Sequence, residues 1–344
     1  MQQIRHRTGA EVLLTGATGF VGSAVARALL GRGHAVRALA RPGGDRRNLA
    51  GIDIEIVDGD LTDAGSLARA IAGCRFLVHV AADYRLWVPD EASMLAANVE
   101  GTRALMRAAL AAGVERVVHC SSVAALGLTA DGSPADEATP VALSALVGPY
   151  KRSKYQAERA VLALVREAGL PAVIVNPSTP VGPRDIKPTP TGKMILDAAA
   201  GRMPGYLDTG LNVVHVDDVA EGHVLALERG RIGERYILGA ENLTLSELFA
   251  ALATLAGVRP PRLRFSEPML WPVALACEGL ARIGVVPPLV TRDHLRMARK
   301  RMFFSSAKAI AELGYAPRPA RAALADAIAW FRAEGRLPPA RGAA

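Results

Sequence analysis

The stretch GPYKRSKYQAERAV, residues 148 to 161, contains two tyrosines that are each followed four residues later by a cation. Tyr150 is paired in this way with Lys154, and Tyr155 with Arg159, so a helix would place each pair side by side. A phenol can act as a general acid or base if its pKa, about 10 when free, is brought near neutrality. A nearby ammonium lowers that pKa, and lysine can also relay a proton, whereas arginine stays protonated.

Helical periodicity separates the two pairs. One stripe of the helix consists of positions 150, 154, 157, 161 and 164. After Tyr150 and Lys154 its residues are small or apolar, so this stripe is expected to face a sheet. The stripe through positions 155, 159, 162 and 166 carries two arginines and is more solvated. Tyr150 and Lys154 are therefore the candidate acid/base pair, and Tyr155 with Arg159 is expected to serve packing or a subunit contact.

Polar side chains are also expected at the carboxyl edge of a parallel sheet, where ligands bind. Ser121 and Ser122 end a strand predicted over 114–122, and a serine hydroxyl there can hold a substrate oxygen beside the phenol. We favour Ser122 for this role. Asn98 begins the helix predicted over 98–113 and can tether backbone or water, with helix capping as the alternative. The predicted catalytic residues are Ser122, Tyr150, Lys154 and Asn98.

The elements that must position these residues alternate between strands and helices. Strands are predicted at 11–16, 34–41, 52–60, 75–82, 114–122 and 170–178. This rhythm predicts an α/β fold with a doubly wound parallel sheet and helices on both faces. The rhythm breaks after residue 178, which predicts a smaller mixed substrate-binding domain. The predicted division is 10–178 for the first domain, with 212–232 able to return to it, and 179–211 and 233–335 for the second.

A glycine-rich turn joins the first strand to the first helix. In TGATGFVG, Gly16 permits a tight turn, Gly19 lets the backbone approach a pyrophosphate, and Gly22 allows close helix packing. The helix N-terminus offers unpaired N–H groups and partial positive charge to phosphates. This placement predicts a Rossmann dinucleotide-binding domain, in which an oxidised nicotinamide would further lower the tyrosine pKa. The predicted contacts are Gly16, Thr18, Gly19, Phe20, Val21 and Gly22.

The end of the second strand bears on which dinucleotide binds. An NAD site places Asp or Glu there for the ribose 2′-hydroxyl, but RALARPGGDRR has Ala40 at that position, followed by Arg41. Arginine can bind a 2′-phosphate, so the sequence favours NADP over NAD. Arg41 could instead be a solvated strand end, and Asp45 could fold back and weaken the preference.

Two further strand ends extend the predicted cofactor site. Asp60, in GDL, is placed to reach the adenine amino group, with Leu61 packing near the ring. A carboxylate at a helix N-terminus is a compatible role for Asp60. The fourth strand ends in HVAA, whose Ala81 and Ala82 are small enough for a sheet edge that lies under a cofactor.

Composition narrows the class of protein. The chain has 344 residues and a net charge of +8, but only 5% aromatics and no Lys/Arg block of five or more, which argues against a nucleic-acid partner. Three separated cysteines predict neither a disulfide nor a metal site. The sequence shows no signal peptide and no spanning segment, which predicts a cytoplasmic protein. The apolar segment 266–290 is predicted to form two short core or domain-packing helices, with a membrane-surface patch as the alternative.

The motifs TGATGFVG, GDL, HVAA, NVEGT, SSVAALG, Tyr150-xxx-Lys154, NPSTPVGP and VHVDDVA together resemble the extended short-chain dehydrogenase/reductase (NAD-dependent epimerase/dehydratase) superfamily. Within it, AADYRLWVPD and NPSTPVGPRDIKPTPTG look like the hopanoid-associated sugar epimerase family of bacteria, and dihydroflavonol reductases are more distantly similar. The resemblance implies a Ser–Tyr–Lys centre at Ser122, Tyr150 and Lys154, assisted by Asn98. It also implies a nicotinamide pocket near Pro177 and Ser178, and a homodimer formed through two helices per subunit.

Two features bear on the substrate. Nucleotide-sugar epimerases of this superfamily usually carry an arginine shortly before the VHVDD strand, where it grips the substrate pyrophosphate, and here Asn212 stands at that point. The apolar stretch YRLWV (84–88) lies where a substrate wall would be, so it forms either the wall for a less polar substrate or a packed loop. The candidate substrate contacts are Tyr84, Trp87, Ser122 and Tyr150.

The expected function is hydride transfer between NADP(H) and a carbonyl or carbinol carbon of a small molecule, with Tyr150 as general acid/base. One alternative is a hopanoid-associated epimerase that acts on a nucleotide- or lipid-linked sugar with tightly bound NAD(P). Another is a non-catalytic nucleotide-sensing protein, which would not need an intact Tyr–Lys pair.

Overall fold

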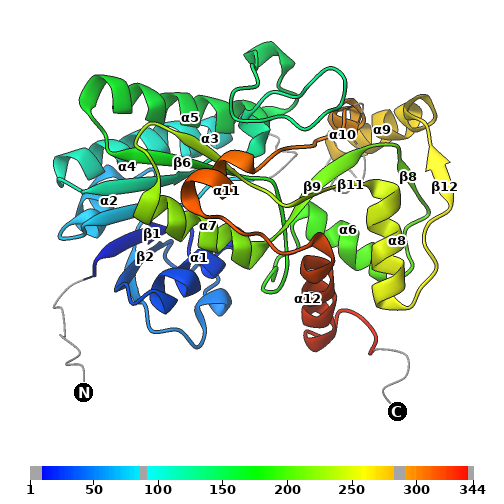
Figure 1. Cartoon of the computed structure of the whole chain (residues 1–344), viewed down its shortest axis with the longest axis horizontal. Coiled ribbons are helices and arrows are strands. Elements are labelled where there is room, and N and C mark those ends of the chain that lie inside the picture. Colours follow the sequence, from blue (N-terminus) through cyan, green and yellow to red (C-terminus); the bar gives the residue numbers. More distant parts are fainter. Residues whose placement is uncertain (1–9, 85–90, 283–290, 299, 340–344) are drawn as a thin grey trace.

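A parallel sheet of seven strands dominates the computed structural model, which describes residues 10–84, 91–282, 291–298 and 300–339 (Figure 1). Every strand pair in this sheet is parallel. In spatial order the strands are β10 (Arg235–Leu238), β6 (Ala172–Pro177), β5 (Arg116–Cys120), β4 (Phe76–His79), β1 (Val12–Thr15), β2 (Val36–Ala40) and β3 (Glu55–Asp58). The predicted doubly wound Rossmann fold is confirmed.

Helices cover both faces of this sheet because its strands are apolar on both sides. Leu14 and the side chains that share its face pack under α1 (Phe20–Gly31) and α7 (Val216–Arg229). Leu13 and its row pack on the opposite face, under α2 (Ala64–Ile71), α4 (Gly101–Ala111) and α5 (Pro149–Ala168). The strand ends that carry the predicted site residues are therefore held between two dry layers.

The chain returns to the first sheet later than the sequence suggests. Residues 210–215 do not join it; they form β9 (Gly210–His215) in a separate sheet with β7 (Thr179–Val181) and β11 (Glu241–Thr244). The return is made by α7, which packs on α1, and by β10, which pairs with β6. Most of the range 212–232 is thus α7, which packs on the first sheet, and the strand that joins this sheet is β10, which contains the fully buried Tyr236.

A second region lies beyond the carboxyl ends of the strands (Figure 1). Its core joins the β9 sheet to α6 (Pro190–Ala199), α8 (Leu245–Ala256) and α12 (Ala320–Ala333). A short pair, β8 (Gly205–Leu207) and β12 (Leu263–Phe265), extends it, while α11 (Ala307–Leu313) packs back on α7.

Two helices cap the second region, α9 (Glu267–Arg282) and α10 (Arg292–Ala298). Within the segment 266–290, where two short helices were predicted, α9 continues through Pro272 as one helix to Arg282, and the rest of the segment, residues 283–290, lies outside the described part. Across the described residues, no helix combines the length and apolarity needed to cross a bilayer.

Short helical turns complete the described chain. They include α3 (Glu91–Leu95), a π-helical turn at Ala96–Glu100, and 3-10 turns at Arg47–Leu49, Val123–Ala125 and Leu143–Ala145. The π turn and the turn at Val123–Ala125 adjoin the predicted catalytic residues.

Candidate active site

Helix α5 presents the predicted acid/base pair to the sheet. It begins at Pro149, and its buried face includes Lys154, Ala157 and Val161, as its periodicity predicted. Lys154 is only 4% exposed, and its Nζ donates to the Cys120 carbonyl oxygen at 2.7 Å. Arg159 is exposed on the other side of the helix. The two Tyr–cation pairs therefore lie in different environments.

The Tyr150 phenol lies near the Ser122 side chain at the end of β5. The Ser122 Oγ also accepts from the Ala124 N–H at 3.1 Å, which fixes that side chain at the start of the Val123–Ala125 turn. Burial raises the pKa of Tyr150 to about 12, and the nearby Ser122 side chain opposes this increase. The protein's own groups thus favour the protonated phenol, contrary to the expectation that Lys154 lowers its pKa.

Ser121 was the alternative to Ser122 as the serine that holds a substrate oxygen. Its Oγ is buried without a hydrogen-bond partner among the described residues. The hydroxyl that meets the phenol is that of Ser122, as we favoured.

The Lys154 ammonium lies in an unusually dry setting for a lysine. Burial lowers its pKa, while the nearby Cys120 and Glu158 act in the opposite direction. Glu158, one helical turn further along α5, is itself buried and accepts from Asn176 Nδ2 at 2.8 Å and from Arg235 at 3.3 Å. The sequence analysis did not identify Glu158, although its spacing of four residues from Lys154 placed it on the same face.

Asn98 links three segments of the site. It lies inside the π turn rather than at a helix start, so it is a tether and not a cap. Its Oδ1 accepts from the Asp83 N–H at 2.7 Å, and its Nδ2 donates to the Asp83 carbonyl at 2.8 Å and to Ser153 Oγ at 3.0 Å. Ser153 Oγ in turn donates to the Tyr150 carbonyl at 2.8 Å. Asn98 therefore couples the loop after β4 to the first turn of α5.

A buried histidine supports Asn98 from below. The Thr102 hydroxyl donates to the Asn98 carbonyl at 2.7 Å, so it must accept from His79 Nε2, which lies 2.9 Å away. His79 Nδ1 then accepts from the Thr15 hydroxyl at 2.7 Å, and Thr15 Oγ1 accepts from the Ala81 N–H at 3.2 Å. Burial lowers the pKa of His79 to about 3, which keeps the ring neutral, as this chain of bonds requires. The sequence analysis quoted this histidine in HVAA but gave it no role.

The glycine turn has the geometry that a dinucleotide requires. Gly16 has a φ of +78°, and a Cβ there would lie 2.6 Å from the Ala81 backbone nitrogen. A Cβ on Gly22 would lie 2.0 Å from the Gly16 carbonyl oxygen, so the turn and α1 can meet only without side chains. The first turn of α1, from Phe20, leaves N–H groups without helical acceptors, as phosphate binding needs. The residues present fit a bound pyrophosphate.

The Arg41 side chain is exposed at the end of β2. Asp45 does fold back, but onto Arg47, with its Oδ2 2.7 Å from the Arg47 Nη2. Arg46 pairs with Asp58 instead. Asp45 therefore pairs with Arg47 and does not neutralise Arg41.

The remaining predicted cofactor residues lie along the same sheet edge. Asp60 Oδ1 accepts from the Thr62 N–H at 2.9 Å and from its hydroxyl at 2.7 Å, and these bonds lower the Asp60 pKa. Asp63, not Asp60, caps α2. Leu61 packs on Gly101, where a Cβ would lie 2.9 Å from the Leu61 Cβ.

Small and polar residues continue this edge on either side of the centre. Ala81 and Ala82 are partly exposed after β4. Pro177 ends β6, and the Ser178 Oγ that follows is buried without a partner among the described residues. An unpaired hydroxyl at this position is available to a ligand.

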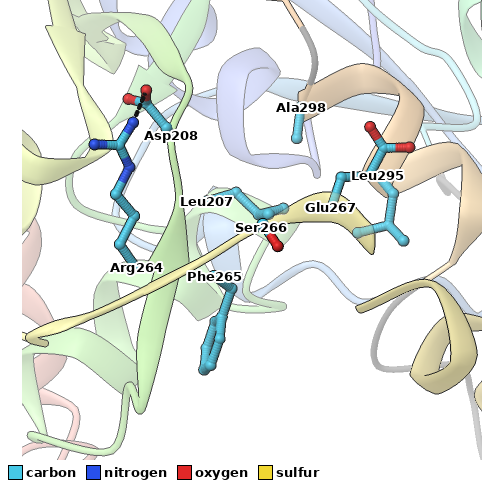
Figure 2. A pocket seen from close by; sticks show the side chains of 8 residues that line it. All are labelled: Leu207, Asp208, Arg264, Phe265, Ser266, Glu267, Leu295 and Ala298. Atoms are coloured by element: carbon cyan, nitrogen blue, oxygen red, sulfur yellow. Dashed lines mark hydrogen bonds and ion pairs between the residues drawn. The ribbon is translucent and has the colours of Figure 1, made fainter. Parts of the chain in front are cut away.

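The described substrate side is mostly apolar. The lining of a cavity of about 140 Å³ includes Val123 and Lys151, which directly follow Ser122 and Tyr150 in the sequence. Tyr84 is 47% exposed beside the site, whereas Trp87 lies outside the described residues. A second cavity, of about 370 Å³, lies between β8, β12, α9 and α10, and none of its lining residues belongs to the predicted site (Figure 2).

Asn212 is committed to the fold. It is 1% exposed, its Oδ1 accepts from the Ala240 N–H at 3.0 Å, and its Nδ2 donates to Asn242 Oδ1 at 2.8 Å and to the Phe304 carbonyl at 3.2 Å. These bonds tie β9 to β11 and to the segment after α10. The side chain is therefore not free to bind a substrate pyrophosphate.

Together, the sheet, the glycine turn and the tyrosine–lysine pair define an NAD(P)-dependent oxidoreductase or epimerase of the extended short-chain dehydrogenase/reductase superfamily. The chain belongs to the NAD dependent epimerase/dehydratase family, whose model matches residues 12–239.

Similar proteins include a putative reductase and a sterol demethylase protein. The chain is 44% identical to a putative dihydroflavonol 4-reductase of Synechocystis sp., with 94% of each chain covered. It is 37% identical to sterol demethylase protein B of Methylococcus capsulatus, over 94% of this chain and 99% of that one. The crystal structure of gox2253 shares 63% identity and superimposes with a TM-score of 0.87, covering 96% of this chain and 100% of that one.

Proposed function

We propose that this protein is an NADP-dependent reductase that converts a carbonyl to a carbinol on a largely apolar small molecule. The observation that carries the proposal is the convergence of the Tyr150 phenol, Ser122 and the buried Lys154 ammonium at the end of β5, where burial raises the pKa of the phenol and favours its protonated form. A protonated phenol is the form required of a general acid in the reducing direction.

Each residue has a distinct role in this proposal. Tyr150 donates its proton to the carbonyl oxygen, which Ser122 holds beside it. Lys154 orients the nicotinamide ribose and passes a proton back toward Tyr150, and Asn98 holds the loop after β4 against α5. The nicotinamide, when bound, supplies the hydride. The glycine turn and the ends of β2 and β3 hold its phosphates and adenosine.

The substrate is proposed to be apolar for two reasons. The cavity whose lining begins at Val123 is formed mostly by apolar side chains, among them Leu126, Leu146 and Phe304, with the cations Lys151, Arg296 and Lys300 also in its wall. Asn212, where a nucleotide-sugar epimerase would use arginine, is bonded into the fold. The similarity to a dihydroflavonol reductase and to a sterol demethylase component supports the same class of substrate.

Arg41 supports the preference for NADP over NAD. It is exposed at the end of β2, Ala40 precedes it, and Asp45 is paired with Arg47. The test is a fluorescence titration of the protein with NADPH and with NADH. The wild-type protein should bind NADPH more tightly, and Arg41→Ala should lose most of this difference in affinity. Tighter binding of NADH by the wild-type protein would refute this assignment.

An epimerase is the second candidate, because the family includes epimerases and dehydratases. The same centre would then oxidise and re-reduce one carbon of a sugar, in a nucleotide- or lipid-linked substrate such as a hopanoid-associated one. A nucleotide-sensing protein without turnover is a third candidate, and the intact Tyr150–Lys154 pair argues against it.

One experiment separates these functions. The protein is purified, its bound nucleotide is released and identified, and a panel of ketones and sugars is screened for NADPH oxidation. Freely exchanging cofactor with ketone-dependent oxidation supports the reductase. Retained cofactor with sugar interconversion and no net oxidation supports the epimerase, and binding without any turnover supports the sensor.

We also propose two features of organisation. Residues 10–178 with α7 and β10 form the nucleotide-binding domain, and the remainder of the described chain forms the substrate-binding domain. The protein forms a homodimer in the cytoplasm, with the outer face of α5 around Tyr155 and Arg159 in the contact. Sedimentation equilibrium of Arg159→Glu, which should shift toward monomer, tests the contact.

A further inference from the structure

Helix α9 shows an inverted distribution of apolar side chains. Most of its large aliphatic residues are exposed, among them Met269 at 63%, Val273 at 46% and Leu280 at 45%, while Leu270 and Trp271 are half-buried. Its buried positions are instead the small residues Ala274 and Ala281. A helix at the surface of a soluble protein normally buries its large apolar residues and exposes its polar ones. The outer face of α9 therefore has the composition of a surface that something covers.

No charge interrupts this face among the described side chains. The other exposed residues of α9 are Pro268, Pro272, Leu275, Ala276 and Gly279. The acidic Glu278 turns inward, where its carboxylate accepts from the Arg292 backbone N–H at 2.7 Å and from the Arg292 Nε at 2.8 Å. The exposed residues thus form a continuous apolar stripe along the helix, which we call the α9 stripe.

Cations gather immediately before the stripe. Arg259, Arg262 and Arg264 are exposed in the segment that leads through β12 into α9, and Leu263 between them is 58% exposed. Figure 2 shows Arg264 turned toward Asp208, with which it forms an ion pair, beside the larger cavity. Arg259 and Arg262 leave this end of the molecule basic, within a chain of net charge +8.

We propose that the α9 stripe and the arginines before it dock the protein on an anionic bilayer surface. Apolar side chains on one face of a helix bury at the boundary of headgroups and acyl chains, and nearby arginines are attracted to anionic lipids. Figure 1 shows α9 and β12 together at one end of the long axis, away from the nucleotide-binding sheet, so a flat surface can approach them.

A second copy of the chain fits this surface less well. In a twofold contact the same patch meets itself, so the arginines of both copies would come close together. An anionic lipid surface satisfies both the apolar stripe and the positive charge.

The test is co-sedimentation of the full chain with vesicles of phosphatidylcholine alone and of phosphatidylcholine mixed with phosphatidylglycerol. We expect binding to the anionic vesicles that weakens with added salt. The variant Met269→Ser/Val273→Ser/Leu280→Ser should have an affinity at least about tenfold lower, because three exposed aliphatic side chains are lost. Arg259→Gln/Arg262→Gln should weaken binding by about fivefold for each arginine.

The matched control is Ile232→Ser/Ile310→Ser, which removes two aliphatic side chains of similar exposure, 52% and 51%, from the loop before β10 and from α11, outside the α9 stripe. The control should bind as the wild type does. Absence of wild-type binding to anionic vesicles, equal binding by the α9 variant, or equal loss in the control would overturn the proposal. A wild-type dimer that the α9 substitutions dissociate without lipid would also overturn it, because the stripe would then be a protein interface.

Discussion

Removal of the Tyr150 hydroxyl should separate catalysis from folding. Tyr150→Phe deletes one oxygen from a buried ring and leaves the Ser122 Oγ bonded to the Ala124 N–H at 3.1 Å. A net hydrogen bond contributes about 1 kcal/mol, so the free energy of unfolding should change by about 1 kcal/mol or less. In a chain of this length that corresponds to a shift in Tm of about 2 °C.

The effect on turnover should be far larger. A positioned general acid accelerates proton transfer by about 10²- to 10⁴-fold. This equals about 3–5 kcal/mol of transition-state stabilisation. NADPH binding should be retained, because the glycine turn at Gly16 to Gly22 lies apart from the phenol. The expected variant therefore folds and binds cofactor but turns over at least about a hundredfold more slowly.

The pH dependence of turnover is an independent test of the role of Tyr150. With a pKa of about 12, Tyr150 stays protonated across the neutral range, so ketone reduction should not fall through its titration there. Carbinol oxidation needs the phenolate and should rise about tenfold per pH unit below the lower pKa that the phenol would have beside an oxidised nicotinamide. Loss of the tyrosine-dependent rise in Tyr150→Phe would confirm its origin.

The assay is steady-state oxidation of NADPH with a ketone identified by the screen, alongside thermal melts and NADPH titration. Tyr155→Phe is the matched control, because it removes the same atom on the same helix from the face opposite the sheet. It should keep most of the activity. Comparable losses of kcat in the two variants would refute the assignment of Tyr150, and so would a Tyr150→Phe enzyme with wild-type kcat.

Three further outcomes follow from buried polar groups. Asn212→Ala should lower the free energy of unfolding in urea by about 1–3 kcal/mol for each stranded partner and leave kcat/KM unchanged at low temperature; a large rise in KM alone would instead indicate substrate binding. Burial raises the pKa of Asp185 from 3.8 to about 6, so its contribution to stability is full below pH 3.8 and is lost as pH rises through 6; Asp185→Asn should flatten that part of a plot of Tm against pH. His79→Ala should lower kcat more than it raises KM, since Asn98 loses the support it receives through Thr102, and unchanged kcat in stopped-flow turnover would contradict this.

The glycine turn and the helix stripe could be predicted because both depend on local geometry. Gly16 needs a positive φ, and Gly22 needs close approach of backbone to backbone, and each requirement is a property of the residue type. The apolar stripe below Tyr150 and Lys154 follows from a period of 3.6 residues. These features therefore survive any arrangement of the rest of the chain.

The supporting residues could not be predicted, because their partners lie far away in the sequence. Glu158 is held in the core by Asn176 on β6 and by Arg235 on β10, which lies 77 residues later in the sequence. The return of β10 to the sheet was likewise not predicted, since the sequence of a short apolar strand does not show which strand it will pair with. The chain from Thr15 through His79 to Asn98 joins ends of two strands and a π turn, and only the folded sheet brings them together.

The same limit explains the Tyr150 pKa. Sequence spacing correctly placed a lysine one turn away, but it could not show that the ammonium is held by the Cys120 carbonyl, which lies two residues before Ser122. The end of β5 thus receives both side chains: its carbonyl orients Lys154 and its serine orients Tyr150. Because each polar group already contacts the end of this strand, the protein's own contacts set the geometry of the pair without lowering the phenol pKa. In the proposed mechanism, a bound oxidised nicotinamide would supply the positive charge that lowers this pKa, so the phenol would become a stronger base only when the hydride acceptor is present.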